Sequence, residues 1–239
     1  MTPSPLPVAA LAMALLAPAA HAQSGLYSQV TLTSDYRYQG VSSTNRKPAL
    51  QGVIHHFRPD GWYAGVFASQ VDYGYAESPN VELDVYGGKT LKLDPKTDLK
   101  LQALGTIFPD DRTPGPTLGF VQGGASIIRR EGPWTLTGLA TYVPQGSYGA
   151  GQVWRAEAAA DYALGHGVTL KALAGHQTTE RRPDRSYWSL GGEVRWKAVI
   201  LEARYQDTDL SRRDCGFNPD ICGASVVGAV SLVLPLILF

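Results

Sequence analysis

In five segments of the chain, charged side chains recur two or four positions apart, and this pattern indicates which residues could act on ions or solutes. The sets are Asp35/Arg37, Glu82/Asp84, Arg155/Glu157/Asp161, Glu193/Arg195 and Glu202/Arg204. Successive side chains of a β-strand point to opposite faces, so each set would lie on one face of its strand. A closed ring of such strands would collect these charges in a lumen, where they hold water and ions and set selectivity through their local field.

These positions predict a water-filled passage lined by ionised groups. The residues assigned to its wall are Asp35, Arg37, Glu82, Asp84, Lys100, Arg155, Glu157, Asp161, Lys171, Glu193, Arg195, Glu202 and Arg204, with Lys100 and Lys171 included if their strands keep the same register. Seven acids against six bases imply at most a weak preference for cations. The alternative is that the charges pair across neighbouring strands and fill the lumen.

Strands of alternating character account for most of the chain. For example, Trp154, Ala156 and Ala158 alternate with Arg155 and Glu157. This period of two predicts β-strands, and the frequent glycine opposes helices. The predicted strands are near residues 26–41, 48–57, 61–73, 81–92, 98–108, 118–129, 133–143, 151–163, 167–177, 186–196, 198–207 and 223–239.

The connections between these segments alternate in length. Short turns, such as those around residues 58–61 and 131–133, alternate with longer loops, such as residues 109–117 and 208–222. Barrels of the outer membrane combine short periplasmic turns with longer external loops in this way. The sequence therefore predicts one all-β domain over residues 23–239, a transmembrane antiparallel up-and-down barrel of about twelve strands.

Aromatic spacing distinguishes a membrane barrel from a soluble lipocalin-like barrel, which keeps its apolar face inside. Three aromatic pairs lie eight residues apart on the uncharged face: Trp134 and Tyr142, Trp154 and Tyr162, and Trp188 and Trp196. Eight strand residues span about 26 Å, or about 20 Å once the strand tilts by about 40°. This length approaches the apolar band of roughly 25 Å that aromatic girdles flank in membrane barrels. We therefore expect the uncharged face to meet lipid.

The composition excludes several classes of protein. Lysine and arginine number 21, as do aspartate and glutamate, so the zero net charge excludes a strongly basic nucleic-acid-binding protein. Hydrophobic residues make up 44% of the chain, which excludes a disordered protein. The sequence has no phosphate-cradling glycine motif, nucleotide fingerprint or zinc spacing, so we expect no cofactor and no metal.

The N-terminal residues predict export. An apolar run at residues 8–17 precedes a small-residue cleavage sequence at residues 20–22, and we assign residues 1–22 to a signal peptide. The only two cysteines, Cys215 and Cys222, would then meet an oxidising compartment, where a local disulfide is expected. The alternative is a metal-binding cysteine pair, but no histidine lies nearby to complete such a site.

The sequence contains no evident catalytic set. A membrane-barrel lipase needs a serine nucleophile oriented by a histidine on the outer surface, whereas His166 lies in a turn and His176 has no strand-spaced serine beside it. We therefore predict that the protein is not an enzyme. His55 and His56 would face opposite ways on a strand, which disfavours a shared metal site. The basic run 180–185 could attract acidic lipopolysaccharide groups or an anionic solute, although such a run is commonly a solvated loop.

Several segments together resemble a known family. They are residues 34–42 (SDYRYQGVS), 47–52 (KPALQG), 61–66 (GWYAGV), 81–88 (VELDVYGG) and 205–209 (YQDTD). These segments are similar to the TorF family of proteobacterial outer-membrane porins, and the paired cysteines before the last strand are similar as well. The resemblance covers most of the chain after residue 22 and implies an outer-membrane pore, with no catalytic residues to carry over.

Taken with this resemblance, the sequence predicts a passive channel in the outer membrane of a Gram-negative bacterium. Expected partners are outer-membrane lipid, lipopolysaccharide and small solutes, and no nucleic acid. The final Phe239 resembles the signature by which the barrel-assembly machinery recognises bacterial outer-membrane barrels. The alternative function is a non-conducting structural or adhesion barrel that acts through its external loops.

Overall fold

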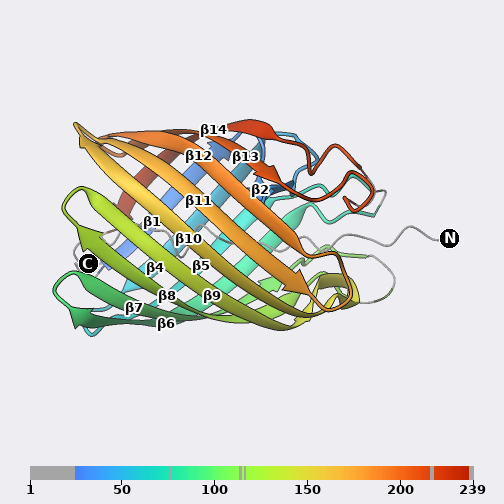
Figure 1. Ribbon diagram of the computed structural model, residues 1–239, viewed down its shortest axis with the longest axis horizontal. Coiled ribbons are helices and arrows are strands. Elements are labelled where there is room, and N and C mark those ends of the chain that lie inside the picture. The colour runs from blue at the N-terminus through green and yellow to red at the C-terminus, as the bar shows by residue number, and fades with distance from the viewer. Residues whose placement is uncertain (1–24, 76, 113–114, 116, 216–217, 237–239) are drawn as a thin grey trace.

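The computed structural model describes residues 25–75, 77–112, 115, 117–215 and 218–236, whose strands form a closed antiparallel barrel (Figure 1). Each wall strand pairs with the next one along the chain, and β1 also pairs with β14, which closes the ring. The wall strands are β1 (Gly25–Thr33), β4 (Ala49–Phe57), β5 (Trp62–Gln70), β6 (Val81–Asp94), β7 (Thr97–Ile107), β8 (Phe120–Glu131), β9 (Trp134–Gly146), β10 (Gly151–Gly165), β11 (Val168–Thr179), β12 (Arg185–Trp196), β13 (Val199–Thr208) and β14 (Ser225–Leu236).

The predicted twelve-stranded barrel is confirmed, with one substantial difference in the first strand. The sequence predicts a strand near residues 26–41, but β1 ends at Thr33. The chain then leaves the wall and forms a separate two-stranded sheet of β2 (Arg37–Tyr38) and β3 (Val41–Ser42). The alternation of side chains continues past Thr33, so the pattern of residues alone could not reveal where the wall strand ends.

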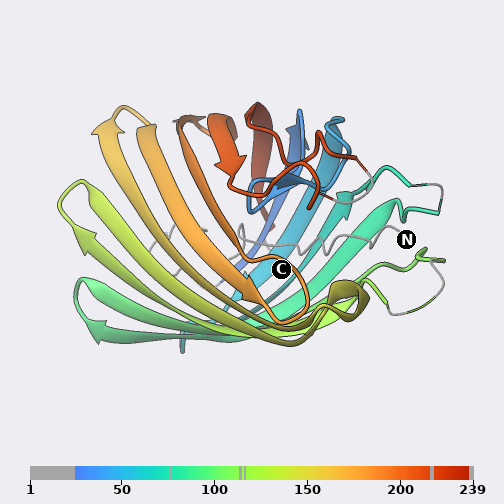
Figure 2. The ribbon, with the colours of Figure 1, turned by 45° about the vertical axis from the view of Figure 1, so that its right-hand side comes forward.

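The two ends of the barrel differ in the length of their connections, as the sequence predicts. Five short turns lie at one end, here called the turn end, and six longer connections lie at the other, here called the loop end (Figure 2). The short three-residue helix η1 (Ser147–Gly149) lies in one of the longer connections, between β9 and β10. None of the described residues belongs to a helix long and apolar enough to cross a membrane.

The uncharged face of the wall points outward. Leu32 is 57% exposed and Leu190 is 65% exposed, whereas their strand neighbours Thr31 and Ser189 are buried. The same alternation places apolar side chains outside on β6, where Val85 is 53% exposed. A soluble barrel of the lipocalin type would bury this face, so the orientation is that of a barrel surrounded by an apolar medium.

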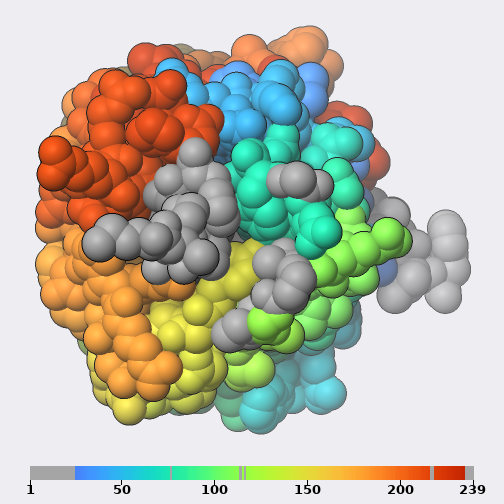
Figure 3. Space-filling view, turned by 90° about the vertical axis from the view of Figure 1, so that its right-hand side faces the viewer, coloured from blue at the N-terminus to red at the C-terminus, as the bar shows by residue number. Residues whose placement is uncertain are grey.

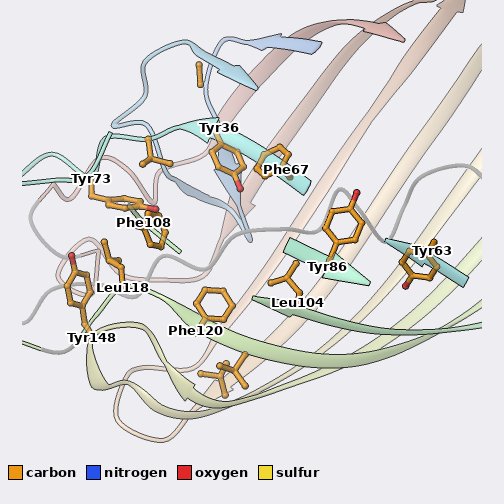
Figure 4. Close-up of a cluster of buried hydrophobic side chains, with 14 residues drawn as sticks. Tyr36, Tyr63, Phe67, Tyr73, Tyr86, Leu104, Phe108, Leu118, Phe120 and Tyr148 are labelled. Carbon is orange, nitrogen blue, oxygen red and sulfur yellow. The ribbon is translucent and has the colours of Figure 1, made fainter. Parts of the chain in front are cut away.

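The inward face is less uniform than the charge pattern suggests. A buried cluster of largely aromatic side chains lines the interior, with contributions from the wall strands β4 to β10 and from the loop-end connections (Figure 4). Tyr63, Phe67, Tyr86 and Phe120 belong to this cluster and are each no more than 6% exposed. The lumen therefore has an apolar, aromatic side as well as a charged side.

The absence of a side chain at Gly88 on β6 lets the Tyr63 ring lie close against the backbone of the inner wall. Tyr63, on β5, lies directly opposite Gly88. The tyrosine hydroxyl donates to the carbonyl oxygen of Leu101 and to Oε1 of Gln102, each at 3.0 Å. A Cβ atom at position 88 would lie 1.9 Å from that carbonyl oxygen and 2.5 Å from the tyrosine oxygen. No L-residue with a side chain fits there without displacement of the backbone.

Two predicted features lie outside the described residues. These are the signal peptide assigned to residues 1–22 and the terminal Phe239. Both stay predictions from the sequence. The boundary of the barrel domain at residue 23 is likewise a prediction, although β1 begins at Gly25.

We predict that Gly88→Ala destabilises the barrel by about 1–3 kcal/mol, because the added methyl group overlaps a backbone oxygen. Gly105→Ala is the matched control, since a Cβ atom there meets nothing within 4 Å. Urea unfolding of the refolded proteins in detergent, followed by circular dichroism, measures the difference. Equal midpoints for the two variants would contradict the close approach described here.

Candidate functional site

Residues 34–46, here called the inner hairpin, fold back into the loop end of the barrel. The two residues between β2 and β3, Gln39 and Gly40, have φ angles of 53° and 79°. Two consecutive positive φ angles are typical of the type I′ turn that joins tightly paired strands. A Cβ atom on Gly40 would lie 2.6 Å from the carbonyl oxygen of Asp207, so the turn presses against the end of β13.

Asp35 holds the inner hairpin together. Its carboxylate accepts hydrogen bonds from the hydroxyls of Ser42 at 2.5 Å and Thr44 at 3.0 Å, and it forms an ion pair with Arg37 at 3.1 Å. Both Asp35 and Arg37 are buried. The structure thus places these two predicted lining residues on the hairpin inside the barrel rather than on a wall strand, and they largely neutralise each other.

Arg37 also ties the inner hairpin to the last connection of the barrel. Its Nη2 donates to the carbonyl oxygens of Ile221 at 3.1 Å and Gly223 at 2.6 Å, and to that of Gly40 within the hairpin. Burial lowers the pKa of the Arg37 guanidinium from its ordinary value, while the neighbouring Asp35 opposes that shift. The group therefore binds three carbonyl oxygens and one carboxylate at once, which fixes the position of the hairpin.

The connection between β13 and β14 is here called the disulfide loop, and its described residues, 209–215 and 218–224, lie over the inner hairpin. The predicted disulfide between Cys215 and Cys222 is confirmed. Both cysteines and Ile221 pack against Val41 of the hairpin in one buried cluster. Figure 3 views the loop end, where the light-blue residues that follow β1 lie beside the orange-red residues that precede β14.

The hairpin contacts the acidic side of the wall through Tyr36. Its hydroxyl donates to Glu82 on β6 at 2.9 Å, and Tyr73 donates to the same carboxylate at 3.5 Å. Burial, reinforced by the negative charges of Glu82 and Asp84, raises the pKa of the Tyr36 phenol well above its usual value, so it stays a neutral donor. Glu82 and Asp84 are both fully buried, as expected for inward-facing side chains.

On the opposite side, the hairpin contacts basic groups of β10 and β12. The Arg155 guanidinium lies 5.4 Å from the centre of the Tyr38 ring, and Arg185 donates a hydrogen bond to Gln39. The sequence favours a solvated loop for the run 180–185, and this is wrong for Arg185, which is the first residue of β12 and is only 4% exposed. The run 180–185 contains three arginines, and its composition does not indicate that the last of them faces inward.

Charges near the turn end pair with one another across strands, which supports the alternative left open by the sequence. Lys171 lies 3.0 Å from Glu193 and 3.9 Å from Glu202, and Arg204 lies 2.5 Å from Glu202. Glu193 and Glu202 are directly opposite each other on β12 and β13, so the lysine separates two like charges. These groups keep partial exposure and are accessible to water.

The remaining predicted lining residues occupy different depths of the barrel. Glu157 accepts a hydrogen bond from Tyr187 at 2.6 Å, and Lys100 lies 4.5 Å from the centre of the Tyr63 ring. Asp161 is half-buried and lies directly opposite Lys171 on the next strand. Arg195 faces the same way as Glu193 but is exposed at the rim of the turn end.

The predicted girdle residues lie on the outer surface at two levels. Trp134 is directly opposite Tyr162 near the turn end, and the two rings are 4.7 Å apart. Tyr142 is directly opposite Trp154 nearer the loop end, with rings 4.4 Å apart. The third pair repeats this spacing, with Trp196 in the last position of β12 at the turn end and Trp188 nearer the loop end.

A serine does lie beside His176, contrary to the sequence analysis. Ser186 is directly opposite on β12, and its hydroxyl is 3.1 Å from Nδ1 of the imidazole on the outer surface. Catalytic serine–histidine pairs also need a third group that orients the histidine. Within the described part of the chain, no hydrogen bond reaches Nε2 of His176, and no group of three or more potential metal ligands occurs.

A family described as "Bacterial protein of unknown function (Gcw_chp)" matches residues 19–222. The chain belongs to this family. The family description differs from the TorF family that the sequence resembles, so that resemblance stays a prediction. No curated protein sequence matches the chain.

Solved structures with a similar fold are outer-membrane channels. The NanC porin matches 89% of this chain and 100% of its own, at 10% identity and a TM-score of 0.59. The KdgM porin, solved in complex with disordered oligogalacturonate, matches 89% and 99%, at 5% identity and a TM-score of 0.59. The COG4313 outer membrane channel from Pseudomonas putida F1 matches 92% and 100%, at 10% identity and a TM-score of 0.57. At these identities the likeness establishes the fold.

We predict that Arg37→Gln loosens the inner hairpin. The shorter, neutral side chain loses charge-assisted bonds to Asp35, Ile221 and Gly223, each worth about 1.5–3 kcal/mol. Amide hydrogen exchange of the Ser42 and Ser43 peptide groups in detergent-solubilised protein should accelerate by about tenfold or more.

Arg58→Gln is the matched control for this experiment. Arg58 lies at the turn end, where its side chain is 60% exposed and pairs with Asp60. The Arg58→Gln substitution removes the same charge without changing any contact of the hairpin. Unchanged exchange of the hairpin in Arg37→Gln would show that this guanidinium does not hold the segment.

Proposed function

We propose that the protein is a channel of the bacterial outer membrane through which small solutes diffuse passively. The observation that carries this proposal is the division of the closed barrel into an apolar outer face and a largely polar and charged lumen. Outward leucine, valine and tryptophan side chains suit contact with outer-membrane lipid and lipopolysaccharide. Inward acids, bases and amides suit water and dissolved solutes. The solute's own gradient supplies the free energy, so the mechanism requires no cofactor.

The lumen offers two chemically different surfaces to a passing solute. Glu82 and Asp84 on β6 carry acidic groups beside the aromatic cluster, and Arg155 and Arg185 on β10 and β12 carry basic groups on the other side. A charge-lined path of this kind selects by local field as well as by width. Arg195 at the turn-end rim would meet a solute at the periplasmic mouth.

The inner hairpin would limit the flow. It contacts β6 through Tyr36, β10 through Tyr38 and β12 through Gln39, and therefore reaches wall strands on different sides of the lumen. We expect a low conductance while the hairpin is in place, and a larger one when it is removed by substitution. Assembly through the terminal Phe239 would deliver the barrel to the outer membrane, as the sequence predicts.

A second function is favoured by the same hairpin. The disulfide loop packs on the hairpin through Val41, Cys215 and Ile221, so two layers of chain lie over part of the loop end. Such a barrel could be a non-conducting structural or adhesion protein that acts through its external loops. Conductance separates the two functions.

We predict that the refolded protein conducts ions in planar bilayers, with a small single-channel conductance. Replacement of residues 36–43 by a glycine–serine linker of equal length should raise the conductance severalfold, because the wall strands stay intact while the lumen widens. Replacement of residues 180–184, another loop-end connection, by an equivalent linker is the control and should leave the conductance near the wild-type value. No current from either the wild-type protein or the hairpin variant would refute the channel and favour the structural barrel.

A further inference from the structure

Three polar side chains form a row across the inner wall close to the hairpin. Arg155 on β10 is directly opposite Gln177 on β11, which is directly opposite Arg185 on β12. All three are buried, at 4%, 5% and 4% exposure. Adjacent strands lie about 4.8 Å apart, so the two arginines belong to one short stretch of wall.

The Arg155 guanidinium is not matched by the protein groups around it. Its nearest carboxylate is that of Glu157, 3.6 Å from Nε, and this acid already accepts a short hydrogen bond from Tyr187. None of its three nitrogens has a hydrogen-bond partner among the residues that the structure describes. A buried cation whose donors are unused costs free energy unless an acceptor occupies them.

Arg185 repeats this shortage of acceptors. One Nη donates to the side-chain oxygen of Gln39 on the inner hairpin, but its Nε has no partner within the described chain. No carboxylate of a described residue lies within ion-pair distance of Arg185. A neutral amide from the inner hairpin thus occupies a position where a charged acceptor would bind more strongly.

A small cavity lies in front of Arg155. Its volume is about 20 Å³, enough for about one water molecule, and its lining includes Tyr38, Thr141 and Gln177 beside the arginine. Phe120 on β8 and Val153 on β10 line it as well, so the wall contributes both polar and apolar side chains to the cavity. Tyr38 belongs to the hairpin, so movement of the hairpin would enlarge this space in front of unused guanidinium donors.

We propose that Arg155 and Arg185 form a binding site for the carboxylate of a small anionic solute. The carboxylate would accept the unused donors of Arg155 in the planar, bidentate geometry that guanidinium groups favour, and would replace Gln39 on Arg185. A cation would be repelled by both arginines, and a neutral solute would leave their charge unbalanced. This inference rests on the proposed channel and names the class of solute that it selects, in place of the weak cation preference implied by the charge count.

The test compares glucuronate with glucose, which differ by one carboxylate, in a saturation-transfer NMR titration of the refolded protein in detergent. We expect glucuronate to bind at least about tenfold more tightly than glucose, and Arg155→Gln to reduce its affinity by about tenfold or more. Arg155→Lys, which keeps the charge but loses the planar fork, should give an intermediate affinity. Circular dichroism, and the difference in gel mobility between heated and unheated samples, check that each variant is folded.

Arg181→Gln is the matched control. Arg181 is also at the loop end, but its side chain is 63% exposed and pairs with Glu180, so the variant removes the same charge without touching the cavity. Its affinity for glucuronate should stay within about twofold of the wild-type value, because exposed charges are strongly screened. An equal loss in Arg181→Gln and Arg155→Gln would overturn a local site, as would equal binding of glucose and glucuronate. Displacement of glucuronate by equimolar chloride would reassign the site to halides and overturn the carboxylate.

The failure of this inference is distinguishable from the failure of the channel. The binding titration in detergent requires no current, so it tests the arginine site even if bilayers stay silent. If the wild-type protein conducts, glucuronate should reduce the single-channel current in a concentration-dependent manner that Arg155→Gln abolishes. A conducting protein whose current responds equally to glucuronate and glucose would keep the channel and refute the site.

Discussion

Closure of the strand ladder is the constraint on which the rest of the structure depends. Pairing of β1 with β14 leaves no wall strand with an unpaired edge, so backbone polar groups are satisfied without water. The two faces of the sheet are then separated completely, and each must suit a different medium. Leucine and valine side chains such as Leu190 lie outside, while Glu82, Asp84 and Arg155 lie inside. The orientation of the candidate functional groups on the wall strands follows from this separation.

The interior shows how a small barrel accommodates charges that its own wall cannot match. Near the turn end, Lys171 lies close to two glutamates on the neighbouring strands β12 and β13, so charges on the wall compensate one another. Nearer the loop end, the inner hairpin supplies the partners: Tyr36 for Glu82, Tyr38 for Arg155 and Gln39 for Arg185. These hairpin groups are neutral, so they solvate the charges without cancelling them. The field across the lumen therefore persists beneath the hairpin and the disulfide loop.

The solved channels and this chain share a barrel fold although their sequences are only 5–10% identical. The residues that the fold requires are therefore few, and they differ from the residues that set selectivity. A barrel needs only alternation, closure and suitable turns, and many sequences satisfy these conditions. Selectivity depends on particular inward side chains and on what covers them. In this protein the covering elements are the inner hairpin and the disulfide loop, which Arg37 and the cluster around Val41 join into one unit.

The strands, the two faces and the disulfide follow from the order of the amino acids, because alternation along a strand and a seven-residue cysteine spacing are local properties. The end of β1 at Thr33, the inward position of Arg185 and the contact of Ser186 with His176 were decided by the tertiary structure. Each depends on strand register or on a partner far away in the chain, as with Arg185 and Gln39, which are 146 positions apart. A period of two cannot encode such pairings, since it specifies which way a side chain faces and not what it meets.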